Sequence, residues 1–309
     1  MKTRSPLILP AYLAVYIIWG TTYFFIAQAV ETMSPAWVLT LRFLTAGTGL
    51  LIFSLLSGQV PKPPTKPQVF TALFYGFFLL ILGNGIVTVA EQRVDSYMAA
   101  LILAAQPINT TLFDFLLNKN KPTWIKVAGM VLGLGGVGIL LYHPEANPQY
   151  SFSILLVLVA LVAFGFGSTA GARMEHHPSL TFHSSLQMLF AGFVALGFTF
   201  FDPIPAFTAF SQFSLSSWIA TGLLVVLGTL GILAFNYLIP REPSHRLSTY
   251  AFVNPVIAVL LGIFIGGEIP VPFLIPGLLT ILLGLALVLY GDRMKNRLIL
   301  ALQPTGCKE

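Results

Sequence analysis

The stretch Tyr250–Glu268, YAFVNPVIAVLLGIFIGGE, decides the fold. It is an apolar helix pattern with a polar residue and a proline side by side, Asn254 and Pro255. A second such pair, Gln106-Pro107, lies 148 positions upstream, and the sequence after each proline aligns without a gap. Pairs separated by this same 148 positions are Pro107 and Pro255, Pro122 and Pro270, Gly129 and Gly277, Gly136 and Gly284, and Tyr142 and Tyr290. One long unit is therefore used twice in the chain.

Composition identifies the solvent in which the chain folds. Hydrophobic residues make up 56% of the 309 residues and charged residues 9%, with a mean hydropathy of +0.85. Soluble domains carry about 25% charged residues, so this is a membrane protein. At about 20 residues per crossing, ten spans fit into the chain and leave little for a soluble domain. The single cysteine, Cys307, rules out a disulfide framework.

Ten apolar runs, delimited by proline, glycine and charge, predict ten transmembrane helices. They cover residues 10–29, 36–57, 68–88, 97–117, 124–142, 151–171, 180–201, 216–238, 247–266 and 272–291. The first run follows two basic residues and ends in Ala27-Gln28-Ala29, as a signal peptide with a small-residue cleavage site could. It is long for the apolar core of a signal peptide, so we expect it to be retained as a helix.

The distribution of basic residues predicts the orientation. With the N-terminus inside, fourteen of the sixteen Lys and Arg residues fall in inward segments, and the outward loops hold Arg93 alone. Such an asymmetry over short loops orients membrane proteins. It predicts a multi-pass protein of the cell inner (plasma) membrane with both termini cytoplasmic. It also accounts for the net charge of +5, so no nucleic-acid partner is needed.

Ten spans in two repeats give five spans each. Because five is odd, consecutive units enter the membrane in opposite senses, as in the inverted repeats of many secondary transporters, whose substrate site lies near the midplane between the halves. The predicted units are residues 1–145 and 146–295, with a linker near 143–150 and a cytoplasmic tail at 296–309. The expected fold is an all-α membrane protein with two inverted five-helix repeats around a central cavity.

Arg42, the sixteenth basic residue, lies inside the second apolar run. A charge at this depth is costly unless it faces a bundle interior, a water-filled cavity or a partner. Two interpretations stay open. Arg42 either snorkels outward or ties to an outer carboxylate such as Glu91 or Asp95, or it attracts an anionic group in the transport pathway. Its counterpart in the second repeat is the neutral Gln187. Arg42, Glu91 and Gln187 are thus the candidate gating or anion-attracting residues.

Pro107 and Pro255 predict helix breaks. A proline within a helix removes one amide donor and frees the carbonyl four residues earlier, and freed groups at membrane depth need polar company or line a cavity. Polar and aromatic residues accompany the prolines and their neighbouring spans. The candidate substrate-binding residues are Trp19, Tyr23, Asn84, Gln106, Asn109, Asn236, Tyr250 and Asn254. Individual amides could instead only hold helices together, but several of them beside broken spans favour a lining.

Other motifs do not indicate chemistry. Residues 133–138 match the dinucleotide pattern GxGxxG, but they lie within an apolar run with no preceding strand. These glycines, like Gly129-x-x-x-Gly133, are interpreted as close contacts between helices. His176-His177 lie in an inward loop without a third ligand and are interpreted as solvated residues rather than as a metal site. Because HExxH, P-loop and Ser/His/Asp patterns are lacking, we expect no enzyme, no cofactor, no metal and no ATP-driven pump.

Four stretches carry a resemblance to a known family. They are Trp19-Gly20-Thr21-Thr22-Tyr23-Phe24, Arg42-Phe43-x-x-Ala46-Gly47, Gly83-Asn84-Gly85-x-Val87-Thr88-Val89-Ala90-Glu91 and the opening stretch, Tyr250–Glu268. On these the chain resembles the EamA-type family of the drug/metabolite transporter (DMT) superfamily, and within it the YedA-like exporter subgroup. The resemblance implies ten helices in two inverted halves, a central cavity, an inner-membrane location and export of metabolites or toxic compounds. The two copies of the repeat differ at the end of the opening stretch. The second copy has Gly266-Gly267-Glu268 where the first copy has Asn118-Lys119-Asn120, so any role of the glutamate is confined to the second half.

The sequence therefore predicts a secondary transporter that exports small organic metabolites, either amino acids or similar solutes or drugs, by alternating access. A passive channel or a non-transporting membrane scaffold is the alternative from another class. The expected partners are a small-molecule substrate and the lipid bilayer, and the expected state is a monomer or a weak dimer. Coupling to protons stays open, because Asp114, the one acid within a predicted span, lies near its inward end.

Overall fold

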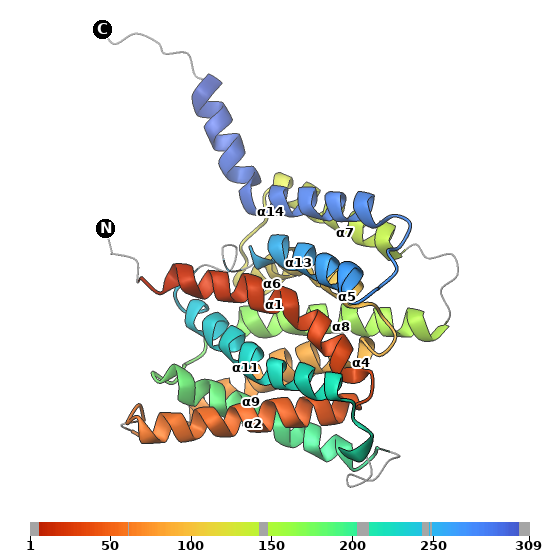
Figure 1. Cartoon of the computed structure of the whole chain (residues 1–309). Coiled ribbons are helices and arrows are strands. Elements are labelled where there is room, and N and C mark those ends of the chain that lie inside the picture. Colours follow the sequence, from red (N-terminus) through yellow and green to blue (C-terminus); the bar gives the residue numbers. More distant parts are fainter. Residues whose placement is uncertain are drawn as a thin grey trace.

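The computed structural model describes residues 6–60, 62–141, 148–202, 210–242, 247 and 249–302 (Figure 1). Within these ranges every regular element is a helix, as the sequence predicts. The predicted linker at residues 143–147 and the end of the predicted tail at 303–309 lie outside the described residues.

Each of the ten predicted runs contains a helix within the described residues. In chain order the helices are α1 (Ile8–Val30), α2 (Pro35–Leu56), α3 (Lys66–Tyr75), η1 (Gly76–Gly85), α4 (Ile86–Ala90), α5 (Ser96–Leu103), α6 (Gln106–Asn118), α7 (Trp124–Leu141), α8 (Pro148–Gly171), α9 (Leu180–Thr199), α11 (Leu215–Leu238), α13 (Tyr250–Phe264) and α14 (Leu274–Leu302). Eight spans of the described chain are long and apolar enough to cross a membrane, whereas α7 and α13 are shorter apolar helices. Because α14 runs to Leu302, the first part of the predicted tail is helical.

Hydroxyl side chains begin several of the helices. The side chains of Ser34, Ser179 and Ser214 each accept a hydrogen bond from a backbone N–H in the first turn of α2, α9 and α11. Thr65 and Gln68 form a reciprocal capping box at the start of α3. Such caps satisfy amides that the start of a helix otherwise leaves unpaired, and they fix where each crossing begins.

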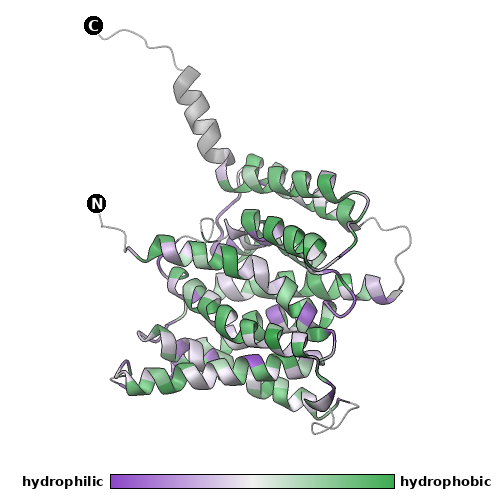
Figure 2. Cartoon of the chain, in the orientation of Figure 1, coloured by the Kyte–Doolittle hydropathy of each residue, from purple (hydrophilic) through white to green (hydrophobic). Residues whose placement is uncertain are grey.

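Apolar residues make up most of the length of the helices (Figure 2), and many of their side chains face outward. Large hydrophobic residues such as Leu56, Phe200, Leu215 and Phe264 are each at least 75% exposed. In water a surface of this kind would promote association, whereas in a bilayer it is the ordinary lipid-facing surface. The outer surface therefore agrees with the membrane location that composition predicts.

Helices α7 and α14 pack backbone to backbone. A Cβ atom at Gly129 would lie 2.7 Å from the carbonyl oxygen of Gly284, and one at Gly136 would lie 3.0 Å from that of Gly277. The residue numbers of the contacting positions decrease along α14 as they increase along α7, so the two helices are antiparallel. These four glycines are two of the repeat-related pairs 148 positions apart. The predicted role in close helix contact is confirmed for Gly129, Gly133 and Gly136. It is wrong for Gly135 and Gly138, where a Cβ atom would meet no described atom within 4 Å.

Helices α2 and α9 meet in the same way. A Cβ atom at Gly47 would lie 2.8 Å from the backbone nitrogen of Leu189, and one at Gly192 would lie 2.8 Å from that of Leu44. Leu44 lies 145 residues before Leu189, and Gly47 lies 145 residues before Gly192. Arg42 and Gln187 have the same spacing. This antiparallel contact again joins repeat-related positions.

The remaining helices cross between the two predicted repeats (Figure 1). Helix α1 packs against α11 and α13. Helix α8, the first of the second predicted repeat, packs against η1 and α4 in the third span and against α5 and α6 in the fourth. Each predicted repeat thus inserts its first helix into the other, and residues far apart in the sequence meet at the centre.

The two prolines act differently on their helices. At Pro107 the fourth span is interrupted as predicted, because α5 ends at Leu103 and α6 begins at Gln106 with the proline in its first turn. In that position the missing N–H leaves no hydrogen bond unmade. The predicted break at Pro255 is not observed, because α13 continues through it. A single proline removes one hydrogen bond from a helix, and α13 accommodates that loss.

The third span contains an element that the sequence did not indicate. Between α3 and α4 lies η1, a π-helix of ten residues. Helices of this type are rare, usually one turn long and frequent at functional sites. Glycines allow η1 to approach its neighbours, since a Cβ atom at Gly76 would lie 2.9 Å from the carbonyl oxygen of Gln187, and one at Gly83 would lie 3.1 Å from the ring of Phe164.

Replacing Gly136 by alanine is expected to lower the thermal stability of the protein in detergent. The new methyl group would lie 2.7 Å from the backbone nitrogen of Ile281, and overpacking of this kind costs about 1–3 kcal/mol. Gly135→Ala is the matched control, because no described atom lies within 4 Å of a Cβ atom there. Equal melting temperatures for the two variants would contradict the packing of α7 against α14.

Candidate functional site

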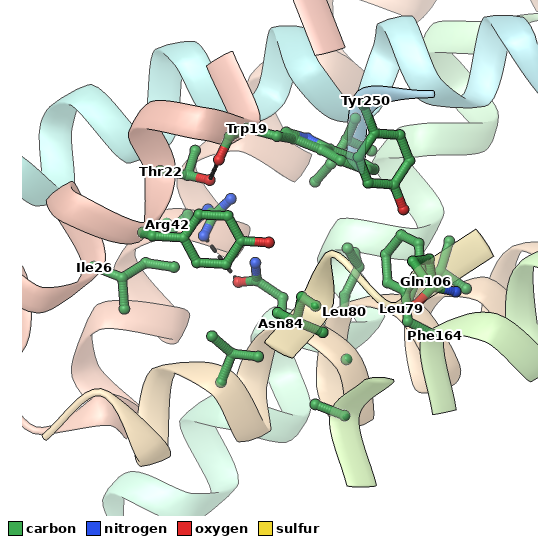
Figure 3. Close-up of a pocket in the computed structure, with 16 residues that line it drawn as sticks. Trp19, Thr22, Ile26, Arg42, Leu79, Leu80, Asn84, Gln106, Phe164 and Tyr250 are labelled. Carbon is green, nitrogen blue, oxygen red and sulfur yellow. Dashed lines mark hydrogen bonds between the residues drawn. The ribbon is translucent and has the colours of Figure 1, made fainter. Parts of the chain in front are cut away.

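A cavity lies at the centre of the bundle, where α1, α2, η1 and α8 meet (Figure 3). Its volume is about 80 Å³, compared with roughly 300–1,000 Å³ for a typical small-molecule pocket. The lining residues come from both predicted repeats. They are Trp19, Thr22, Tyr23, Ile26, Arg42, Leu79, Leu80, Gly83, Asn84, Val87, Leu103, Gln106, Ala160, Phe164, Ile232 and Tyr250. The structure therefore closes a narrow, mixed polar and aromatic space between the two halves of the chain.

Six of the residues predicted for the site line this cavity together: Trp19, Tyr23, Arg42, Asn84, Gln106 and Tyr250. They come from five different spans, α1, α2, η1, α6 and α13. The π-helix η1 is prominent among these elements, since it contributes Leu79, Leu80 and Gly83 as well as Asn84.

Arg42 is buried at the cavity wall, with 3% of its surface exposed. Its guanidinium group donates a hydrogen bond of 2.9 Å to Oδ1 of Asn84 (Figure 3), and its Cζ lies 5.1 Å from the ring centroid of Phe43. A Cβ atom at Gly228 would lie 2.6 Å from Nη2 of Arg42, so α11 leaves room for the guanidinium group only by having a glycine there. Arg42 thus neither snorkels to the surface nor forms a tie to Glu91, whose oxygens have no hydrogen-bond partner among the described residues.

Aromatic rings form one wall of the cavity. The ring centroid of Trp19 lies 4.7 Å from that of Phe235, 5.2 Å from that of Tyr250 and 5.7 Å from that of Phe164. Tilted and edge-on arrangements at these distances are favourable for aromatic pairs. Sequence reasoning missed Phe164 and Phe235. No sequence signal pointed to Phe164: where Gly20-Thr21-Thr22 is aligned with the similar Gly167-Ser168-Thr169, the residue at the position of Trp19 is Phe166.

Gln106 and Tyr250 separate this cavity from a second, smaller one. The second cavity has a volume of about 20 Å³, and its other lining residues are Thr110, Ser168, Ala172, Phe235, Ile239 and Leu247. In the amide orientation that satisfies both of its groups, Gln106 donates to the carbonyl of Leu161 at 3.3 Å and accepts from the N–H of Gly165 at 3.1 Å. The two side chains therefore form a partition within the bundle.

The other predicted amides lie between helices rather than on the cavity wall. Asn109 donates to the carbonyl oxygen of Leu161 at 2.5 Å, and Asn254, suitably oriented, donates to that of Tyr16 at 2.9 Å. Asn236 on α11 donates to Ser184 at 2.9 Å and to Oε1 of Gln187 at 3.0 Å, both on α9. A direct role in substrate binding for Asn109, Asn236 and Asn254 stays a prediction, as does a gating or anion-attracting role for Gln187.

The sequence model of the EamA-like transporter family matches residues 7–142 and again residues 151–290. This chain belongs to the EamA-like transporter family. The double match covers both predicted repeats and agrees with the duplication found in the sequence.

Several proteins are similar to this EamA-family chain. The "Uncharacterized inner membrane transporter YedA" of Escherichia coli (strain K12) is 38% identical over 84% of this chain and 82% of its own length. An "Uncharacterized transporter" of Buchnera aphidicola subsp. Schizaphis graminum is 28% identical over 84% of this chain and 86% of its own. A protein of known crystal structure shares 21% sequence identity with this chain. The two structures superpose with a TM-score of 0.68 over 94% of this chain and 100% of the other chain, which supports the fold. The protein is thus a membrane transporter by family.

Two carboxylates mark the end of the EamA bundle that is predicted to face outward. Glu268, just after α13, accepts hydrogen bonds from the backbone N–H groups of Ser96 and Tyr97 at 2.9 and 3.4 Å, which caps the start of α5. The hydroxyl of Tyr97 donates to the carbonyl of Ile269 at 2.9 Å. Glu91, which follows α4, is 6% exposed, and neither of its oxygens has a hydrogen-bond partner of normal geometry among the residues that the structure describes.

Histidines gather at the opposite end of this EamA-family protein. The expectation that His176 and His177 are solvated is wrong for His177, which is 6% exposed, while His176 lies 3.3 Å from the hydroxyl of Tyr75 and beside the buried ring of His183. Burial lowers the pKa of His176 from its ordinary value of 6.5. Among the described residues no group of three His, Cys, Asp or Glu side chains could hold a metal ion. The rings of His176 and His183 pack against Tyr75 and against each other.

Asn84→Leu is expected to destabilise the protein by about 1.5–3 kcal/mol, because it removes the acceptor of a buried charged donor. Thr88→Val is the control one turn later on the same face. The Thr88 hydroxyl donates to the carbonyl of Asn84 at 2.9 Å within its own helix, so its loss should cost under about 1 kcal/mol. Thermal unfolding of both variants measures the difference, and a smaller effect for Asn84→Leu than for Thr88→Val would show that Arg42 does not depend on this bond.

Proposed function

We propose that this protein is a ten-span secondary transporter, built of two inverted five-helix repeats at residues 1–145 and 146–295, that exports a small organic solute by alternating access. The observation that carries the proposal is the narrow central cavity, whose wall takes residues from both predicted repeats and places Arg42 and Asn84 opposite aromatic rings. A central site between two repeats is the arrangement from which one repeat can rock against the other.

The glycine contacts support the inverted relation. In the contact of α7 with α14, Gly129 meets Gly284 and Gly136 meets Gly277. A repeat-related pair of helices that meets in this reciprocal, antiparallel manner requires a two-fold axis perpendicular to the helices. For helices that cross a bilayer, such an axis lies in the plane of the membrane. The reciprocal contact of α2 with α9 supports the same axis.

The form of the cavity favours a carrier over a channel. A channel needs a continuous wet pathway, whereas here Gln106 and Tyr250 divide two spaces of about 80 and 20 Å³. The described residues thus hold a closed conformation, and a solute requires a rearrangement to pass. A membrane scaffold without a transport cycle predicts no flux of any solute, which the counterflow experiment below tests.

The lining suggests the chemistry of the solute. Arg42 is the charged group among the lining residues, and Asn84 and Gln106 supply amides beside it. Trp19, Tyr23 and Tyr250 offer aromatic faces. A small molecule with a carboxylate at one end and an apolar body matches this division, as amino acids and related metabolites do. Drugs with the same division of charge and apolar surface are the second class.

The cytoplasmic orientation of both termini and the location in the inner membrane belong to the same proposal. The excess of basic residues in the segments that would face inward supports this orientation, and the inner-membrane relative named above agrees with the location.

Counterflow into proteoliposomes tests the proposed function. Vesicles loaded with unlabelled amino acids are expected to accumulate labelled amino acid from outside transiently, and the rate should saturate with concentration. A flux that rises linearly without counterflow would establish a channel. If neither amino acids nor a wider panel of labelled metabolites moves faster than in empty liposomes, the transporter proposal fails.

Trp19→Ala is expected to lower the counterflow rate by at least about tenfold, because it removes the partly buried ring that packs against Phe164, Phe235 and Tyr250 at the cavity wall. A loss of about 1.4 kcal/mol in the stabilisation of the rate-limiting state gives this factor. Trp124→Ala is the matched control, since Trp124 on α7 is 70% exposed and lies away from the cavity. Trp19→Phe should restore part of the rate. Equal rates in Trp19→Ala and Trp124→Ala would place the solute pathway elsewhere.

A further inference from the structure

Glu91 lies one helical turn beyond the central cavity. Its N–H donates to the carbonyl oxygen of Val87 at 2.9 Å, and Val87 lines the cavity. The side chain is 6% exposed, and both carboxylate oxygens are buried without a hydrogen-bond partner of normal geometry, although the backbone of Ala27 on α1 is close enough to interact. An unpartnered carboxylate in this position calls for an explanation, because buried polar groups are otherwise almost always hydrogen-bonded.

The titratable groups around Glu91 come from several elements. Helix α1 contributes Tyr23, α2 contributes Arg42, and Glu268 follows α13. Helix α8, which also packs against α4, carries Tyr150, whose electrostatic partner is instead Asp95. Arg42 attracts the negative charge of Glu91, but its hydrogen bond goes to Asn84. Glu91 therefore has one repelling carboxylate and one attracting guanidinium group near it, and is bonded to neither.

Free energy favours the neutral acid in this arrangement. An ionised carboxylate without hydrogen bonds in a low-dielectric interior is costly, and such a group takes up a proton instead. Glu91 follows Ala90, the last residue of the third span. Burial and the nearby Glu268 raise its pKa well above the ordinary value of 4.5, whereas Arg42 acts in the opposite direction.

We propose that Glu91 is a proton-binding site that couples solute movement to proton exchange. The inference rests on the proposed transport function and adds the coupling ion and the residue that carries it. In the conformation described here Glu91 holds the proton. Release breaks the carboxyl O–H bond, passes the proton to water on the side to which the bundle opens, and leaves a carboxylate.

Arg42 provides the link between the proton and the cavity. While Glu91 is neutral, the guanidinium group bonds to Asn84 on the cavity wall. Once Glu91 is ionised, it competes with Asn84 for the same guanidinium group, because charge-assisted pairs are stronger than bonds to a neutral amide. Proton loss thus draws Arg42 away from Asn84 and changes the charge that the solute meets. The two events are coupled because one guanidinium group serves both partners.

Infrared difference spectroscopy tests the proton site without any solute. At neutral pH the wild-type protein is expected to show the C=O stretch of a neutral carboxylic acid, which shifts in deuterated water and is absent from Glu91→Gln. The matched control is Glu31→Gln, because Glu31 is an exposed carboxylate at the end of α1 that bonds to Gln28 at 2.9 Å, and its substitution should leave the band unchanged. A wild-type spectrum without this band, or a band that persists in Glu91→Gln, overturns the proposal.

Transport measurements test the coupling. The probe is a labelled amino acid mixture in proteoliposomes with an imposed pH gradient, with an entrapped pH-sensitive dye to follow protons. In wild type and in Glu31→Gln, the ratio of the solute concentrations on the two sides of the membrane is expected to change by about tenfold for each unit of the pH gradient, as the exchange of one proton per solute requires. Glu91→Gln should keep counterflow but lose this response.

The outcomes separate the two proposals. Saturable wild-type counterflow that ignores the pH gradient overturns the coupling and leaves the transport function standing. Absence of wild-type counterflow with every solute overturns the transport function and the coupling with it, while the infrared band still decides whether Glu91 binds a proton. If Glu91→Gln does not fold, a titration of the wild-type band serves in its place, and a band that has already vanished at neutral pH overturns the proposal.

Discussion

A guanidinium group inside a membrane protein must be solvated by the protein itself, and the arrangement around Arg42 follows from that constraint. Asn84 on η1 accepts a hydrogen bond from Arg42, Phe43 offers a ring face, and Gly228 leaves the space that a side chain on α11 would fill. Three spans are thereby fixed around one charge. The cavity exists where these spans meet, because a buried charge cannot be packed with apolar side chains as tightly as a core can.

The two repeats use the same positions for different purposes. Arg42 on α2 bonds to Asn84 in the third span, and its counterpart Gln187 on α9 bonds to Asn236 in the eighth. The geometry is shared, but the charge is present in the first repeat and lacking in the second. A charged pair on one side and a neutral pair on the other give the central space a polarity that two identical repeats would not have. The two predicted repeats thus differ in charge at this pair of corresponding positions.

Much of this arrangement could be predicted from the sequence, and the physical reasons are clear. Apolar runs bounded by proline and charge give the helices, because the bilayer admits few alternatives. The repeat spacing gives the glycine contacts of α7 with α14. Trp19 and Gln106 could be assigned to a cavity from their residue types and their positions among the polar residues that accompany the prolines, whereas two interpretations of Arg42 stayed open. The π-helix η1 and the interhelical bonds of Asn109 and Asn254 could not, because helix type and the direction of an amide depend on which neighbours pack against it. The burial of Glu91 was hidden for the same reason.

The small volume of the central cavity has a consequence for how the protein would be measured. A solute cannot enter a space of about 80 Å³ unless the bundle first adopts a wider form, so binding samples only the fraction of molecules in that form. The dissociation constant observed is then the intrinsic one divided by that fraction. Weak apparent binding to the resting protein is therefore compatible with a tight and selective site. Substitutions far from the solute that destabilise the narrow form would increase the apparent affinity, because they raise the fraction of molecules in the wider form.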